Sequence, residues 1–414
     1  MGPRALYDKS FLEGLNVDEA VMFDYFFYPV TCPVFFVETL ADLDKEMKRG
    51  RTAEEVVGSI ALKTPQMHGG PNVYHRSIVI SNLMGNHVPM TGQIVIAGGR
   101  PVHVKGKNSV VIENTPEAEA FDRWQRGAFL DVERGFAQRW RAEMKQLDLS
   151  VFAARAQTYG FDISACKNLR HARSLAQAII EQLDPKQQLQ FAADRLSLYD
   201  AELKRGIMDA WGRTGGHALA VYAPYASFVL IIELFFEIAL ARGMISVDRT
   251  SNFNDLAYLY YLPFCDTFIS SDRLHRECAP LFLRSDQEFS WGQDVKRGLR
   301  ENHEALMKLP DEVRNRGLLS MSPAPQPGII ADIYARLAHS PAPKPNPSRP
   351  DAPNNAPSLD SLADMVKEIS DAPSVDQSAF FPSDKADSMV IQRQVSRRRG
   401  SWFQVPHDLK RDAP

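Results

Sequence analysis

The chain has 414 residues, of which 44% are apolar and 24% are charged. This composition is typical of a globular protein and excludes a fibrous or wholly disordered one. The formal net charge of −3 excludes an overall field that would attract nucleic acid, so a polyanionic partner needs a local basic patch or metal ions. Four scattered cysteines predict a reducing compartment. Because the first residues do not form a secretory signal, we expect a cytoplasmic protein.

The N-terminal pattern places two acidic residues directly after predicted strands. It predicts a short strand over residues 4–7 that ends at Asp8, followed by a helix over residues 11–28. Residues 30–43 are apolar and β-branched at first and become helical around Glu38.

The middle of the chain changes from a strand pattern to a helix pattern. Residues 93–113 alternate with a period of two, with turn signals at residues 98–99 and 105–108, and predict a β-meander built from three segments. Thr115 is expected to cap a long amphipathic helix that begins at Pro116. One apolar stripe is expected along this helix, made of Phe121, Trp124, Ala128, Val132, Phe136, Trp140 and Met144.

Residues 218–240 are the most apolar stretch. Their uncharged part is shorter than the roughly 20 residues that span a bilayer, and Glu233 and Glu237 lie in the second half. We therefore expect a buried core helix and no membrane contact. The two glutamates are expected to satisfy buried backbone or arginine groups, with a shared metal as the alternative.

Residues 251–271 predict a helix followed by a buried strand. Asn254 or Asp255 is expected to cap the helix, which ends at a proline. The strand over residues 266–270 then leads to Asp272.

The C-terminal part is rich in proline from residue 322 to residue 357. Such a composition cannot bury enough apolar surface to offset its ordering entropy. We predict that the folded part ends near residue 320 and that residues 322–414 form a disordered tail. Residues 358–370 have the spacing of a short helix, which either docks on a protein partner or forms transiently. Basic and aromatic residues at 397–403 either contact RNA or add solubility.

Four acidic residues occupy positions where parallel α/β sheets gather their active residues. Asp8 and Asp272 follow strands, and two more acids lie on the helices nearby. If the strands are neighbours, the four carboxylates converge and favour a hard divalent cation such as Mg²⁺ or Mn²⁺. A cation held in this way can promote hydrolysis of a phosphate ester.

Three segments resemble the PIN-like nucleases. ALYDKSF resembles the strand-Asp-x-Ser opening of that family, FFVETLADL is similar to its second acidic motif, and NDLAYLYYLPFCDTFISSDRLH resembles its closing unit. The resemblance implies a catalytic quartet that binds the metal, supported by two hydroxyl groups. The quartet is Asp8, Glu38, Asp255 and Asp272, and the supporting residues are Ser10 and Ser270.

The resemblance also implies a fold and an activity. It implies a three-layer α/β/α fold, dependence on Mg²⁺ or Mn²⁺, and hydrolysis of phosphodiester bonds, with RNA the favoured substrate and DNA the alternative. The span between Glu38 and Asp255 is far longer than in a compact PIN-like domain. We therefore predict a discontinuous core over residues 1–50 and 205–315. A mainly helical insertion over residues 51–204 carries the meander and contributes partly to the core.

Several other residues are candidates for the site. His275 could carry a proton or contact phosphate, or it could be a plain surface histidine. Asp266 competes for the third acidic position and is interpreted as a structural cap, whereas Asp42 and Asp44 compete for the second. An RNA backbone could lie on basic residues of the long helix, unless they form an ordinary solvated face. These are Arg123, Arg126, Arg134, Arg139, Arg141 and Lys145.

The sequence leaves two alternatives to an endoribonuclease. A protein with the same fold could act as a non-catalytic scaffold through its surface or tail. A phosphohydrolase could use the same metal site on a small substrate. Homo-oligomerisation is open in all three cases.

Overall fold

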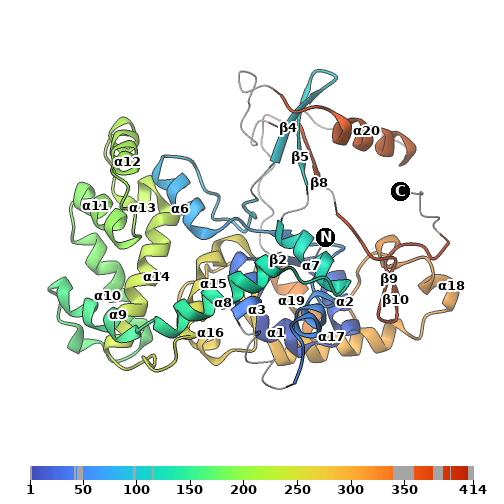
Figure 1. The fold of residues 1–414 in the computed structure, drawn as a ribbon, viewed down its shortest axis with the longest axis horizontal. Coiled ribbons are helices and arrows are strands. Elements are labelled where there is room, and N and C mark those ends of the chain that lie inside the picture. Colours follow the sequence, from blue (N-terminus) through green and yellow to red (C-terminus); the bar gives the residue numbers. More distant parts are fainter. Residues whose placement is uncertain are drawn as a thin grey trace.

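The computed structural model describes residues 2–41, 43, 50–96, 99–113, 116–338, 359–375, 386–391 and 393–408. These residues form a mixed α/β protein around a parallel sheet (Figure 1), which confirms the predicted class. The sheet order is β3-β2-β1-β6-β7, and every neighbouring pair is parallel. The strands are β1 (Arg4–Tyr7), β2 (Tyr28–Thr31), β3 (Gly70–Pro71), β6 (Thr267–Ser270) and β7 (Glu288–Trp291).

The order of the strands creates a switch point beside β1. The chain adds β2 and β3 on one side of β1, and later adds β6 and β7 on the other. Leu6 pairs with Phe268 and Tyr7 with Ile269, so the carboxyl ends of β1 and β6 are neighbours. Such switch points are where open α/β sheets bind their ligands. The predicted strands at residues 4–7 and 266–270 are confirmed.

The predicted single helix over residues 11–28 is wrong, because α1 (Lys9–Gly14) and α2 (Val17–Phe26) replace it. Asn16 separates them: its side chain accepts a hydrogen bond from the Glu19 amide (2.8 Å), and the Glu19 carboxylate accepts one from the Asn16 amide (2.8 Å). This capping box starts a new helix at Val17.

Further helices cover the sheet. α2 packs against α17 and β2, and α17 also contacts β6 and β7; α3 packs against α15. The bounds of these elements are α3 (Pro33–Ala41), α5 (Ala53–Ala61), α15 (Asn252–Tyr258), α16 (Arg273–Cys278), α17 (Gly292–Leu306), α18 (Asp311–Arg314) and α19 (Ile329–Ala338), with the 3₁₀ turns η3 (Leu259–Phe264), η4 (Ala279–Leu281) and η5 (Leu318–Ser320).

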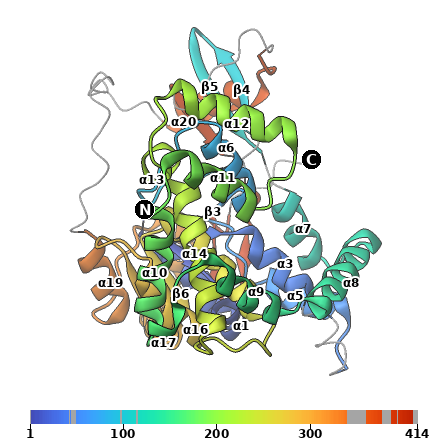
Figure 2. The ribbon, with the colours of Figure 1, turned by 90° about the vertical axis from the view of Figure 1, so that its left-hand side faces the viewer.

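A second group of helices packs around α14 (Figure 1 and Figure 2), which contacts α6, α9, α10, α11 and α13. By length and composition α14 could cross a membrane, yet 72% of it is buried inside the protein. This burial agrees with the predicted core helix. The group comprises α6 (His75–Leu83), α9 (Leu149–Ala156), α10 (Leu169–Glu181), α11 (Pro185–Arg195), α12 (Ala201–Arg213), α13 (Leu219–Tyr222) and α14 (Pro224–Ala241), with the turns η1 (Gln157–Tyr159) and η2 (Ile163–Ala165).

The two glutamates of α14 have side-chain partners. Glu237 accepts hydrogen bonds from Tyr159, Arg155 and Arg195. Glu233 accepts one from Tyr260. A buried carboxylate with such partners is a structural element of the core, and the expectation of arginine partners is confirmed for Glu237.

The predicted meander is partly wrong. β4 (Gly99–Val104) and β5 (Lys107–Ile112) form an antiparallel hairpin through a turn at Lys105 (φ 50°) and Gly106 (φ 77°). The third strand of this sheet is β8 (Ser388–Ile391), which pairs parallel to β5. Residues 93–96 run instead as irregular chain, where the Val95 amide donates to the Asn72 side chain (3.1 Å).

The predicted long helix is also interrupted. It consists of α7 (Pro116–Gln125) and α8 (Asp131–Gln146). Gly127 takes a φ of 75°, which ends α7. The Glu133 carboxylate accepts from the Leu130 amide (2.8 Å) and from Trp124 Nε1 (2.9 Å), which starts α8 in a new direction. Val132 is therefore 69% exposed, and the single apolar stripe does not continue. The proposed cap, Thr115, lies outside the described residues.

Much of the predicted disordered tail is ordered where the structure describes it. α19 packs against α17, and α20 (Leu359–Asp371) contacts β4, β5 and β8, which confirms the short helix. Residues 393–408, here called the strap, run back over the sheet domain and contain β9 (Arg398–Arg399) and β10 (Trp402–Phe403). The prediction failed here because tertiary contacts supply the burial that local composition lacks. Residues 339–358, 376–385 and 409–414 lie outside the described residues.

Two buried side chains hold the strap. Arg399 forms an ion pair with Asp24 (3.3 Å) and donates to the Leu62 carbonyl (2.8 Å). Trp402 is buried, and its Nε1 donates to His303 Nδ1 (3.1 Å). The basic and aromatic residues at 397–403 therefore include anchors to the chain itself, and the predicted choice between RNA contact and solubility omitted this role.

Candidate functional site

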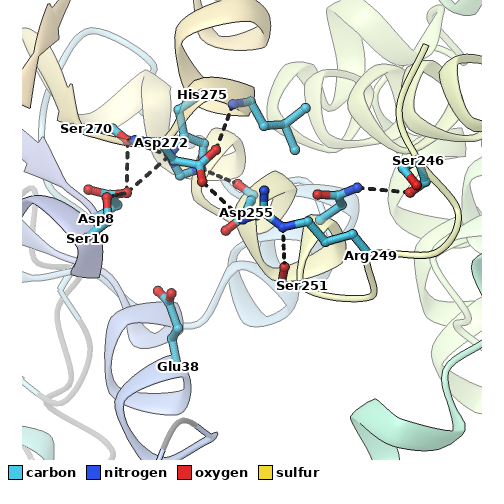
Figure 3. Close-up of polar contacts among 12 residues, drawn as sticks. Asp8, Ser10, Glu38, Ser246, Arg249, Ser251, Asp255, Ser270, Asp272 and His275 are labelled. Atoms are coloured by element: carbon cyan, nitrogen blue, oxygen red, sulfur yellow. Dashed lines mark hydrogen bonds and ion pairs between the residues drawn. The ribbon is translucent and has the colours of Figure 1, made fainter. Parts of the chain in front are cut away.

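Asp8 follows β1 directly and is buried at the switch point of the sheet. Its Oδ1 accepts the Phe11 amide (3.0 Å) and thereby caps α1. Its Oδ2 accepts the hydroxyl groups of Ser10 (2.6 Å) and Ser270 (2.9 Å) (Figure 3). The predicted supporting residues therefore do contact this carboxylate. Burial raises the pKa of Asp8, but His275, the Ser10 hydroxyl and the Phe11 amide outweigh it, so the pKa is lowered overall.

Ser270 ends β6 and connects Asp8 with the next segment. Its hydroxyl donates to Asp8 and accepts the Asp272 amide (2.9 Å). His275 Nδ1 lies 2.8 Å from the same hydroxyl oxygen, and His275 Nε2 lies 2.7 Å from the Asp255 carbonyl oxygen. If the Ser270 hydroxyl donates to Asp8, then Nδ1 of His275 donates to Ser270 while Nε2 donates to the Asp255 carbonyl, so a protonated ring satisfies every contact.

His275 is buried, and the charges around it favour its protonated form. Burial alone would lower its pKa, but the Asp8 carboxylate, 3.4 Å from Nδ1, and Asp255 raise it to about 9. The plain surface histidine considered from the sequence is wrong, because the side chain is buried. Its contacts give it a positioning role, since it holds Asp8, Ser270 and the first turn of α15 together.

Asp272 caps α16 two residues after β6. Its Oδ1 accepts the Leu274 amide (2.7 Å), which fixes the carboxylate. Its Oδ2 lies 3.3 Å from Nη2 of Arg249, an exposed residue on the turn before α15. Figure 3 shows Asp272 beside Asp255, with Arg249 approaching both.

Asp255 lies in the first turn of α15 rather than at its cap, because the helix starts at Asn252. Its Oδ2 is buried and has no hydrogen-bond partner among the described residues; Nη2 of Arg249 is 3.7 Å away. Burial raises the pKa of Asp255 to about 6, with His275 opposing and Asp272 adding to the shift. This oxygen is ready to accept a cation or a proton.

Glu38 comes to the site from α3, on the opposite side from Asp272. Its carboxylate points toward the side on which Asp8 lies (Figure 3). Tyr258 donates to its Oε2 (2.6 Å). Removal from water raises the pKa of Glu38 to about 8; Lys9 and Tyr258 oppose this shift, and Asp255 and Asp8 add to it.

The structure brings all four predicted acids to one region, but not into a closed ligand set. Within the described ranges, no three His, Cys, Asp or Glu side chains are grouped closely enough to hold an ion as arranged. The donor chemistry nevertheless fits a hard cation, because four carboxylates face one region and Asp255 Oδ2 lacks a hydrogen bond. Binding one ion to all four requires their side chains to move toward it.

Among the described residues, no acidic residue that competed for the second or third position of the quartet is seen in the site. Asp266 lies at the opposite end of β6 and forms a bidentate pair with Arg4 (2.9 and 2.5 Å), so its structural interpretation is supported. Asp42 and Asp44 lie outside the described residues.

A pocket of about 390 Å³ between β3 and α7 is lined by residues such as His68 and Arg123, and the quartet does not line it.

The predicted basic face is largely neutralised. Arg123 pairs with Glu133, Arg126 with Asp122, and Arg134 with Glu54; Arg141 donates to the Ala41 carbonyl at the end of α3. Arg139 and Lys145 are exposed on α8. The helix that carries them, α8, packs against α3, the helix of Glu38.

Two residues of the site were missed from the sequence. Tyr258 orients Glu38, and Arg249 contacts Asp255 and Asp272. Both flank Asp255 within one short segment. Their closeness to Asp255 in the sequence is the signal that indicates them, but the tertiary fold decides where their side chains point.

Comparison with known protein families, with curated proteins and with solved structures gives no match. The function is therefore inferred from the geometry of the site.

Glu38 should make the stability of the metal-free protein fall with rising pH. Between the unfolded pKa of 4.5 and the folded value of about 8, the folded protein keeps a proton that the unfolded chain has lost. Stability therefore decreases as the pH rises through this window. His275 acts in the same direction, because its raised pKa favours folding below 6.5 and this contribution is lost through about 9.

Glu38→Gln should consequently have a higher Tm than the wild type at pH 9 and nearly the same Tm at pH 5. Thermal unfolding in EDTA measures this difference, and Glu312→Gln, at an exposed position of α18, is the control. Parallel Tm–pH curves for wild type and Glu38→Gln would show that Glu38 titrates normally in the folded protein.

Proposed function

We propose that this protein is a metal-dependent phosphodiester hydrolase of the PIN-like kind, and that RNA is its substrate. The observation that carries the proposal is the convergence of Asp8, Glu38, Asp255 and Asp272 at the switch point between β1 and β6. The order of the parallel strands and the helices around them is compatible with the three-layer α/β/α fold that the sequence resemblance implies.

The metal would be held by the carboxylates of the quartet. Mg²⁺ or Mn²⁺ would supply Lewis acidity for a phosphate oxygen and for an attacking water. The chain contributes positioning: Ser10 and Ser270 fix the Asp8 carboxylate, and the cap of α16 fixes Asp272. Fixed ligands reduce the reorganisation that the reaction requires.

RNA is proposed as the substrate because of the surroundings of the site. α8 presents Arg139 and Lys145 next to the helix that carries Glu38, and a phosphate backbone can bind such charges. The quartet does not line the described pocket between β3 and α7, so a small substrate gains no support from that pocket.

The test is cleavage of a labelled single-stranded RNA with Mn²⁺ or Mg²⁺, compared with EDTA. Asp272→Asn should lose roughly 100-fold in rate, because one charged ligand is removed while the asparagine still caps α16. Asp294→Asn, which removes a half-exposed carboxylate paired with Arg297, is the matched control and should cut normally. Metal-independent cutting, or equal rates in both variants, would contradict the proposal. Metal-dependent stabilisation without RNA cutting would favour the small-substrate alternative, and the absence of both would favour the scaffold.

A further inference from the structure

Arg249 is a cation that approaches the acidic site from its exposed edge. Its Nη2 lies 3.3 Å from Asp272 Oδ2 and 3.7 Å from Asp255 Oδ2. Its Nε donates to the Ser251 hydroxyl (2.9 Å), which holds the guanidinium at the edge of the site (Figure 3). The side chain is 58% exposed and comes from the turn between α14 and α15.

We infer that Arg249 exchanges between the carboxylates of Asp255 and Asp272 and the phosphate of the substrate. This inference rests on the proposed function, because it assigns these two aspartates to the metal. Arg249 would then be the phosphate-binding residue of the site.

The exchange follows from competition for the same oxygens. A guanidinium and a divalent cation compete for Asp255 Oδ2 and Asp272 Oδ2, because two cations held against the same two oxygens repel each other. Asp255 Oδ2 has no hydrogen bond among the described residues. Arg249 therefore offsets part of the negative charge of Asp255 but donates no hydrogen bond to this oxygen. The divalent ion, with twice the charge, is the stronger partner for both carboxylates.

The displaced side chain remains beside the site. Arg249 lies on the turn between α14, which ends at Ala241, and α15, which begins at Asn252. Its exposed side chain has room to turn toward solvent, from which a substrate arrives. A guanidinium presents paired N–H donors that match two oxygens of a phosphate. Arg249 is therefore placed to bind the phosphate whose other oxygens face the carboxylate site.

The ion pair of Arg249 with Asp255 and Asp272 can be removed by substituting the arginine. The Arg249 side chain is 58% exposed and contacts the aspartates at 3.3 and 3.7 Å, so the pair contributes little to folding and Arg249→Ala should fold normally. Arg273→Ala is the matched control, because Arg273 is the neighbour of Asp272 and is 89% exposed, but it pairs with Glu277 on the outer face of α16.

The experiment titrates each full-length protein with Mn²⁺ by calorimetry and then measures cleavage of a labelled single-stranded RNA. Arg249→Ala should bind Mn²⁺ roughly two- to fivefold more tightly than the wild type, the factor expected for removing a competing ion pair whose cationic partner is exposed. Its kcat/KM for RNA should fall about 10- to 100-fold, as for a lost hydrogen bond to a charged group, with a raised KM. Arg249→Lys should restore part of the cleavage.

The outcomes separate the two hypotheses. If the wild type binds Mn²⁺ and cuts RNA, but Arg249→Ala and Arg273→Ala give equal Mn²⁺ affinities and equal cleavage, the exchange is wrong and the proposed function stands. If Mn²⁺ binds only to Arg249→Ala, the divalent ion does not displace the guanidinium in the wild type, and the exchange is wrong. If no protein binds Mn²⁺, the proposed function fails and the exchange fails with it.

Discussion

Asp8→Asn should abolish metal-dependent RNA cleavage while leaving the protein folded. Under the proposed function Asp8 is a buried charged ligand of the metal, and its loss removes several kcal/mol of transition-state stabilisation, which corresponds to about 1,000-fold in kcat. The fold should survive because asparagine caps helices as well as aspartate does, and its oxygen can still accept the Phe11 amide.

The neighbours of Asp8 sharpen this prediction. In Asp8→Asn the buried His275 loses the carboxylate that raises its pKa, so its pKa should fall from about 9. Ser10→Ala keeps the Asp8 carboxylate and removes one of its donors, so it should cost about tenfold, the size expected for one lost hydrogen bond to a charged group.

Single-turnover cleavage and a histidine titration by NMR measure the two effects. If Asp8→Asn retained more than a tenth of the wild-type rate, Asp8 would not be a metal ligand. An unchanged titration of His275 in this variant would show that Asp8 and His275 do not form an ion pair.

Arg399→Met should destabilise the protein by about 3 kcal/mol, the lower end of the cost of breaking a buried ion pair. Asp24 is completely buried, and its partner Arg399 is nearly so. The lower end applies because Asp24 keeps three backbone donors in the variant, from Gln66 (2.6 Å), Met67 (2.8 Å) and His68 (2.9 Å).

The neighbouring Arg398 provides the control. It is exposed and lies over the Phe403 ring, so Arg398→Met should change the free energy of unfolding by less than about 0.5 kcal/mol. Urea unfolding of the two variants measures the difference, and limited proteolysis shows whether the strap leaves the sheet domain. Equal free energies of unfolding for Arg398→Met and Arg399→Met would mean that the strap does not stabilise the fold.

The sequence by itself determined the features that depend on neighbouring residues. The strands before Asp8 and Asp272, the apolar helix over residues 224–241 and the short helix at residues 359–371 follow from local periodicity and capping. The two wrong helix predictions also concern local signals, because each interruption has a capping or turn residue in the sequence. The Asn16–Glu19 capping box and Gly127 are visible in the sequence, and both interrupt a helix that periodicity alone continues.

Only the tertiary structure decided the features that join distant segments. β8 pairs with β5, and Arg399 reaches Asp24, across most of the chain; such contacts offset the ordering entropy that a proline-rich composition cannot offset locally. The same holds for the site. Burial sets the pKa of Glu38 to about 8, and the fold brings Arg249 to Asp272. Desolvation and charge proximity are properties of three-dimensional neighbours, and a linear pattern of residues does not specify them.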